Sequence, residues 1–277
     1  MMIYRGRTFD EERALYGSDG VEVVNCRFEG PADGESALKE SRNVKVSGTY
    51  FNLRYPFWHD KKVLVKNSEF TKLCRAAFWY SEDVRISGSR LFGIKAVREC
   101  KGIAMDNCEI ASPEFGWSVH GMDMVSCKVE GDYFMLRSDK LNFDHVALNG
   151  KYSFQYISDS EFVNCEFDTK DAFWHAKNVI VRNSVVKGEY LGWYCENVTF
   201  ENCTITGTQP LCYCKGLRLI DCEMHQTDLA FEKSEVDAVV LTEIDSIRNP
   251  KRGTIKAPSI GNIIMDDPEA DARISST

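Results

Sequence analysis

The chain has 277 residues, of which 43% are hydrophobic and 27% are charged, so it has enough apolar side chains to build a folded core. Its formal net charge of −8 argues against non-specific nucleic-acid binding, which needs a basic surface. The first residues lack the apolar stretch of a secretory signal, and no apolar run reaches transmembrane length. We therefore expect a cytoplasmic protein with no nucleic-acid partner and no membrane partner.

Residues 1–20 come before a repeated pattern that starts at Val21. We expect them to cap one end of the fold, because an uncovered terminal coil exposes unpaired strand edges that can aggregate.

From Val21 onwards a line of eight residues recurs, and from residue 84 each copy begins 19 residues after the last. A fixed short period is typical of a solenoid, in which each repeat buries its apolar face by stacking on its neighbours. The copies are VEVVNCRF (21–28), VKVSGTYF (44–51), VLVKNSEF (63–70), VRISGSRL (84–91), IAMDNCEI (103–110), MDMVSCKV (122–129), LNFDHVAL (141–148), SEFVNCEF (160–167), VIVRNSVV (179–186), VTFENCTI (198–205) and LRLIDCEM (217–224).

Each copy alternates two apolar positions with polar ones, which predicts a short strand with one face turned inward. A corner residue follows, usually Asn, as at Asn25 and Asn164, or Gly, as at Gly48. Asn and Gly tolerate the left-handed backbone that a sharp corner needs. These features predict an all-β, right-handed parallel β-helix with about 11 or 12 coils between residues 21 and 244. A leucine-rich repeat is disfavoured, because its repeat is longer and carries a different motif.

The chain contains eleven cysteines. An odd number argues against a complete set of disulfides, and six of the eleven fall at one register of the repeat. We expect them to be reduced and to pack in the core as small apolar residues. Only Cys212 and Cys214 are close in sequence, and this CxC spacing is a weak metal signal. We therefore predict no metal and no cofactor.

A second column of lines lies between the copies, for example RAAFWYS (75–81), PEFGWSV (113–119), KDAFWHA (170–176) and EYLGWYC (189–195). All five tryptophans share one register in this column. The register after them holds mainly Tyr, His and charged residues. Neighbouring strand residues face opposite ways, so only one of the two rows should be exposed unless a bend intervenes. The sequence leaves open which row that is.

Aromatic rings bordered by charged and hydroxyl groups suit carbohydrate, because sugar faces stack on rings and sugar edges take hydrogen bonds. We predict a saccharide-binding groove along the second column. Its candidate ligand-binding residues are Arg75, Trp79, Tyr80, Lys95, Arg98, Glu99, Glu114, Trp117, Asp132, Trp174, Trp193 and Tyr194.

If the protein is an enzyme, a polysaccharide lyase or a glycoside hydrolase is the expected type. Hydrolysis needs two carboxyl groups at a set separation, and elimination needs a base and cations beside a uronate. The densest cluster of suitable groups contains the candidate catalytic residues Lys151, Lys170, Asp171, His175 and Glu189. The same charges also fit a structural ladder of ion pairs between coils, such as Lys95 over Glu114 and Lys170 over Glu189. The sequence does not decide between catalysis and this ladder.

Residues 245–266 contain two prolines and two glycines and are expected to form an irregular C-terminal cap. Residues 267–277 are expected to be a loose tail. The prediction is one domain over residues 1–277.

Several second-column strings together resemble a known family. DGESALKES, GIKAVREC, SPEFGW, GKYSFQYI, TKDAFWHAKNV, GEYLGWYCENVT and GTQPLCYCK are similar to signature segments of DUF3737, a bacterial family of unknown function. The resemblance covers roughly residues 4 to 265. It implies a pectin-lyase-like right-handed β-helix, in agreement with the repeat. It implies no established activity, so it supplies no catalytic residues.

The sequence thus favours a protein that binds or acts on a saccharide. A non-catalytic scaffold that presents the same face to a protein partner is the alternative. The oligomeric state is left open.

Overall fold

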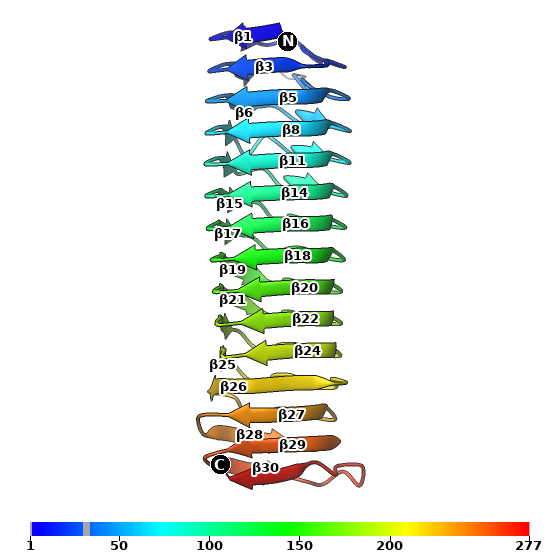
Figure 1. Cartoon of the computed structure of the whole chain (residues 1–277), viewed down its shortest axis with the longest axis vertical. Helices are drawn as coiled ribbons and strands as arrows, with labels where there is room; N and C mark the ends of the chain where they lie inside the picture. The colour runs from blue at the N-terminus through cyan, green and yellow to red at the C-terminus, as the bar shows by residue number, and fades with distance from the viewer. Residues whose placement is uncertain (1, 30–33, 277) are drawn as a thin grey trace. The chain divides into compact units, whose positions relative to one another are not determined.

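A computed structural model describes residues 2–29 and 34–276 of the chain. It divides into two compact units, Met1–Asn142 and Phe143–Thr277. Each unit is built from parallel strands that stack coil upon coil (Figure 1). The near strands of each unit point left in Figure 1 while the chain descends, which is right-handed winding. Within the described ranges no helix is long and apolar enough to cross a membrane.

In the first unit, each coil contributes one long strand to a first sheet and, after a corner, one short strand to a second sheet. The long strands are β1 (Met2–Arg5), β3 (Val21–Val24), β5 (Arg42–Ser47), β8 (Lys61–Lys66), β11 (Glu82–Ser87), β14 (Lys101–Asp106) and β16 (His120–Val125). The short strands are β2 (Thr8–Phe9), β4 (Arg27–Glu29), β6 (Tyr50–Asn52), β9 (Glu69–Phe70), β12 (Arg90–Leu91), β15 (Glu109–Ala111) and β17 (Lys128–Glu130). A third, small sheet holds β7 (Phe57–Trp58), β10 (Phe78–Trp79) and β13 (Val97–Arg98).

The strand β18 (Asp139–Asp144) covers the point in the sequence where the second unit begins. The long strands of the second unit are β20 (Ser158–Val163), β22 (Lys177–Arg182), β24 (Glu196–Glu201), β26 (Leu217–His225), β27 (Glu235–Val240), β29 (Arg252–Ala257) and β31 (Arg273–Ser276). Its other strands are β19 (Ala147–Lys151), β21 (Glu166–Lys170), β23 (Val185–Lys187), β25 (Thr204–Thr206), β28 (Ile244–Arg248) and β30 (Ile260–Ile264).

The strand registers confirm the predicted repeat. Val84 pairs with Ile103, and Val179 pairs with Val198, so in these strands each residue stacks on its counterpart 19 positions away. The corners are left-handed as expected, with φ of 50° at Asn25. Gly48 has φ of 57°, and a Cβ there would lie 2.2 Å from Oδ1 of Asn25. The corner of that coil therefore needs glycine, because the asparagine of the previous coil occupies the space.

The core is made of files of like side chains. Phe9, Phe28, Phe51 and Phe70 stack in the first unit with ring centroids 4.7 to 5.0 Å apart. All eleven cysteines are buried and free, as predicted. Nine of their eleven thiols donate weak hydrogen bonds to carbonyl oxygens of the preceding coil, as Cys222 does to Phe200 at 3.3 Å. They therefore pack as small residues whose polar atom is satisfied.

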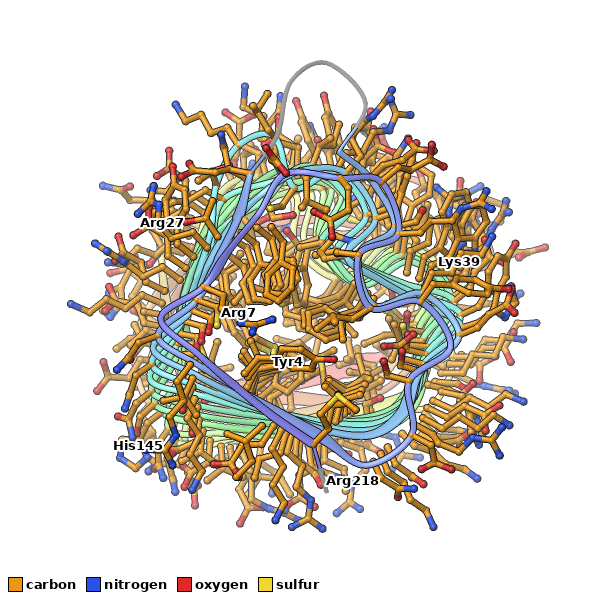
Figure 2. All side chains as sticks on the ribbon, turned by 90° about the horizontal axis from the view of Figure 1, so that it is seen from above. Tyr4, Arg7, Arg27, Lys39, His145 and Arg218 are labelled. Carbon is orange, nitrogen blue, oxygen red and sulfur yellow. The ribbon has the colours of Figure 1, made fainter. Side chains whose placement is uncertain are left out.

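The ends of the chain are more regular than predicted. Within the predicted cap 1–20, β1 and β2 already pair with β3 and β4, and side chains of Tyr4 and Arg7 lie across the end of the core (Figure 2). The expected loose tail is wrong for Arg273–Ser276, because β31 pairs with β29. Ala238 pairs with Ile255 only 17 positions on, so these coils depart from the period. That all of 1–277 forms one domain stays a prediction, and its two terminal residues lie outside the described residues.

Candidate functional site

The second column exposes both of its outer rows, because a bend lies between them. Phe173 is buried in the core, whereas Trp174 and His175 are both partly exposed. His175 has φ of 57°, and Tyr80 and Tyr194 have φ of 57° and 60° at the same register. A left-handed residue interrupts the strand alternation, so the side chains before and at the bend both lie outside. We call the tryptophan register the inner row and the following register the outer row.

The inner-row tryptophans join successive coils by hydrogen bonds. The indole N–H groups of Trp117, Trp174 and Trp193 donate to the backbone carbonyls of Tyr133, Tyr190 and Gln209, at 2.7 to 2.8 Å. The rings of Trp174 and Trp193 also stack on each other, with centroids 5.3 Å apart and planes within 4°. Their N–H groups and facing ring surfaces are therefore used within the fold.

We expect Trp193→Phe to lower the free energy of unfolding by about 1 kcal/mol more than Trp58→Phe does. Both changes replace an indole by a smaller ring at the same register. Only Trp193 donates a hydrogen bond, since the buried indole N–H of Trp58 has no partner among residues 2–29 and 34–276. Urea denaturation of the two variants checks this, and equal losses would contradict a bonding role for the indole.

The outer row of the second unit is a continuous stack of rings. Tyr156, His175, Tyr194 and Tyr213 follow one another with centroids 4.7, 5.1 and 4.9 Å apart and planes within 14°. Half of Tyr156 and 44% of Tyr194 are exposed. Because each ring covers the face of the next, the stack presents ring edges, hydroxyl groups and one imidazole to solvent.

In the first unit, the inner row places one cation between two rings. The Arg98 guanidinium lies 5.5 Å from the ring centre of Trp79 and 5.3 Å from that of Trp117. A hydrogen bond to Glu99 raises the pKa of the exposed Tyr80. These contacts are of the cation–π and charge-assisted kinds, so Arg98 and Glu99 already have partners within the protein.

Four of the five candidate catalytic residues gather at the leading edge of the column. Lys151 and Lys170 are register partners on β19 and β21. Asp171 is 8% exposed and donates its backbone N–H to the carbonyl of Glu189 at 2.8 Å. Burial raises the pKa of the Asp171 carboxyl, with Lys170 opposing this shift and Glu189 adding to it. His175 lies apart, within the ring stack of the outer row.

The predicted ladder of ion pairs is found in part. Lys95 pairs with Glu114 at 3.2 Å, as expected. Lys170 pairs with its neighbour Asp171 at 4.0 Å, and within the described part of the chain it makes no ion pair with Glu189. The side chains of the remaining candidates, Arg75 and Asp132, are exposed at the leading edge of the first unit.

Sequence reasoning missed a hollow on the outer face of the first sheet. In the first unit this face holds a groove of about 940 Å³. The side chains and backbone that line it come from six successive coils: Asn43, Val44, Lys45, Lys62, Val63, Leu64, Asp83, Arg85, Gly102, Ile103, Ala104, Gly121, Met122, Asp123, Lys140 and Asn142. A signal was present, since two of the six coils that line the groove have glycine at one register where the other four have Asn, Lys or Asp.

Comparison with solved structures finds matches of low sequence identity. The A-module of mannuronan C-5 epimerase AlgE4 from Azotobacter vinelandii is 11% identical, with 86% of this chain and 87% of that chain covered and a TM-score of 0.40. A double mutant of the tailspike protein of E. coli bacteriophage HK620 is 9% identical, with 93% and 62% covered and a TM-score of 0.46. The fluoroquinolone resistance protein QnrB1 is 14% identical, with 85% and 91% covered and a TM-score of 0.21.

No curated protein matches the sequence. Residues 2–276 match the family model described as "Protein of unknown function (DUF3737)".

Proposed function

The chain belongs to the DUF3737 family of proteins of unknown function, and we propose that it binds a saccharide along the outer row of the second column. The observation that supports this proposal is the stack of Tyr156, His175, Tyr194 and Tyr213, whose centroids repeat at 4.7 to 5.1 Å. This repeat is close to the length that one pyranose unit adds to an extended polysaccharide. Successive sugars would therefore meet equivalent groups on successive coils.

The proposed contacts are hydrogen bonds to ring edges. Stacking of a sugar on an aromatic face needs a free face, and within the row each ring lies against the next. Tyrosine hydroxyl groups donate and accept, and the imidazole of His175 does both in its neutral form. At the end of the row, the Tyr213 hydroxyl donates to Glu232 at 3.3 Å, and Arg248 lies 3.6 Å from the same carboxylate. These contacts hold the Tyr213 side chain in place, so its hydroxyl oxygen could accept a hydrogen bond from a ligand without a change in position.

A catalytic version of the proposal uses the leading edge of the same coils. The buried Asp171 carboxyl, with its raised pKa, suits a general acid, because a proton donor must hold its proton near the working pH. Lys170, Lys151 and Glu189 would supply cations and a second carboxylate. If the protein is a polysaccharide lyase or a glycoside hydrolase, Asp171→Asn abolishes turnover while binding and folding persist. The non-catalytic alternative is a scaffold that presents this face to a protein partner.

We expect the triple variant Tyr156→Phe, Tyr194→Phe, Tyr213→Phe to bind saccharide tenfold or more weakly than the native protein. It removes three hydroxyl groups, at about 0.5 to 1.5 kcal/mol for each lost bond, and keeps the ring stack. A glycan array identifies the ligand, and titration calorimetry then measures its affinity for both proteins.

The matched control is Tyr50→Phe, which removes a hydroxyl from β6, on the second sheet of the first unit. Near-ultraviolet circular dichroism shows whether the packing of the triple variant is native. An array ligand that binds the triple variant as tightly as the native protein would remove the outer row as its site.

A further inference from the structure

The groove on the first sheet of the first unit owes its depth to three small residues. Gly102 and Gly121 are consecutive in one file of coil positions, with φ of 65° and 80°. The same file carries Asn43, Lys62 and Lys140 in other coils. Ala104 stands in the next outward-facing file, between Arg85 and Asp123. Long side chains therefore surround a floor made of glycine backbone and one methyl group.

The hollow continues on the other side of Ala104. A second cavity of about 300 Å³ shares Leu64, Arg85, Ala104 and Asp123 with the groove. At a strand spacing of about 4.8 Å, six coils give the groove a length of roughly 24 Å. This shape fits an elongated ligand that lies along the stack of coils.

The groove is cationic on a chain whose formal net charge is −8. Four cations, Lys45, Lys62, Arg85 and Lys140, line it against two carboxylates, Asp83 and Asp123. None of the four makes an ion pair with any residue that the structure describes.

The register just beside the groove behaves differently. There Arg42 pairs with Asp19, Lys61 with Glu82 and His120 with Asp139, at 2.6 to 3.6 Å. Each of these three edge side chains has a partner within the fold, whereas the four cations that line the groove have no ion-pair partner among the described residues. Unpaired cations around a concave surface attract anions.

The carboxylates narrow the class of ligand. Asp83 and Asp123 lie among the cations, and Asp123 accepts a hydrogen bond from the Asn142 amide at 3.0 Å. A ligand with an anionic group on every unit, such as a nucleic acid, would meet like charge at these positions. Carboxylates and amides instead suit hydroxyl groups, which donate to the first and donate or accept with the second.

We propose that this groove binds an elongated, hydroxylated ligand that carries isolated oxyanion groups, either carboxylates or phosphate esters. Arg85 and Lys62 take the oxyanions, Asp83 and Asp123 take hydroxyl groups, and the floor at Ala104 admits the chain of the ligand. The groove and the outer row are different surfaces, so this site does not depend on the proposed function.

Three oligosaccharides of equal length distinguish the sources of charge: a maltooligosaccharide with one glucose unit oxidised to a glucuronate, a maltooligosaccharide that carries one phosphate ester, and the neutral maltooligosaccharide. We expect at least one charged probe to bind the full chain at least tenfold more tightly than the neutral one. That affinity should fall tenfold or more in Arg85→Gln and in Ala104→Gln, which fills the hollow without changing charge. Titration calorimetry measures all of these affinities.

The matched control is Arg218→Gln, an exposed arginine at the same outward register in the second unit. It removes one positive charge that is not part of the groove lining, and we expect it to leave binding unchanged. The proposal is overturned if neither charged probe binds, if the neutral probe binds as tightly, or if Arg218→Gln weakens binding as much as Arg85→Gln. Tighter binding of a single-stranded oligonucleotide than of either charged saccharide would also overturn it. Loss of binding only in the triple tyrosine variant would assign the ligand to the outer row instead.

Discussion

Replacing Asp60 by serine is expected to stabilise the protein at neutral and alkaline pH, by on the order of 4 kcal/mol at pH 7. Asp60 is completely buried, and burial raises the pKa of its carboxyl from 3.8 to about 9. One of its oxygens, Oδ1, accepts the backbone N–H of Ser41 at 3.2 Å. The other, Oδ2, has no partner within the described ranges. At pH 7 the carboxyl of Asp60 is therefore protonated in the folded protein, whereas it is ionised in the unfolded chain.

The sign of the pH dependence follows from this difference. Between pH 4 and pH 9 the folded state holds a proton that the unfolded state has released. Stability therefore falls as pH rises through this window, by at most about 1.4 kcal/mol per pH unit from this residue. Below pH 4 both states are protonated and the effect vanishes.

Serine suits position 60 because the neighbouring coils already use it there. Ser81 Oγ accepts the backbone N–H of Asp60 at 3.2 Å, just as Asp60 accepts that of Ser41. Urea denaturation of the native protein and the variant from pH 4 to pH 9 measures the effect. The exposed Asp168, replaced by serine, is the control. Parallel stability curves for native protein and Asp60→Ser would show that Asp60 is ionised in the fold.

The second large effect is expected in the phenylalanine core of the second unit. Phe173→Ala should lower the free energy of unfolding by about 3 to 5 kcal/mol. The ring is fully buried and stacks on Phe154 at 4.8 Å, with Phe162 and Phe200 edge-on at 5.7 and 6.3 Å. Backbone hydrogen bonds fix the spacing of the coils, so they cannot close the space that the ring leaves.

Phe173→Leu is the matched variant, because it keeps most of the volume and should lose much less stability. Urea denaturation compares the two, and hydrogen exchange shows whether the damage stays in the coils around residue 173, as nearest-neighbour stacking in a repeat protein predicts. A loss below about 1 kcal/mol for the alanine variant would mean that the core rearranges around the cavity.

The fold could be predicted from the sequence because its determinants are local and repeated. Apolar alternation in a copy such as VIVRNSVV marks a strand, and Asn or Gly marks the left-handed corner that follows it. The terminal strands β29 and β31 were not predicted because the repeat is interrupted before them. Ala238 pairs with Ile255 only 17 positions on, and the 19-residue period returns between Ile255 and Ile274.

The candidate site could be predicted only as a column of residues. Its orientation depends on left-handed residues such as His175 and Tyr194, and these residue types do not signal that conformation as Asn and Gly do. The sequence also could not predict which ring faces are exposed, because a ring face is covered or left open by the side chain of the neighbouring coil. The groove was missed for a related reason: it arises where side chains are small, and reasoning from chemically rich residues passes over Gly102 and Ala104.

The coils of the groove from Glu82 onwards repeat every 19 residues, and this gives the groove a modular character. Excision of residues 101–119 would place the strand that begins at His120 directly after the one that begins at Glu82, since both share one register with Lys101. Every inward file would stay in phase, and the floor would shorten by one strand spacing of about 4.8 Å. Copies of this gene that gain or lose whole repeats would therefore change the length of ligand they accommodate in discrete steps, with no new side chain required.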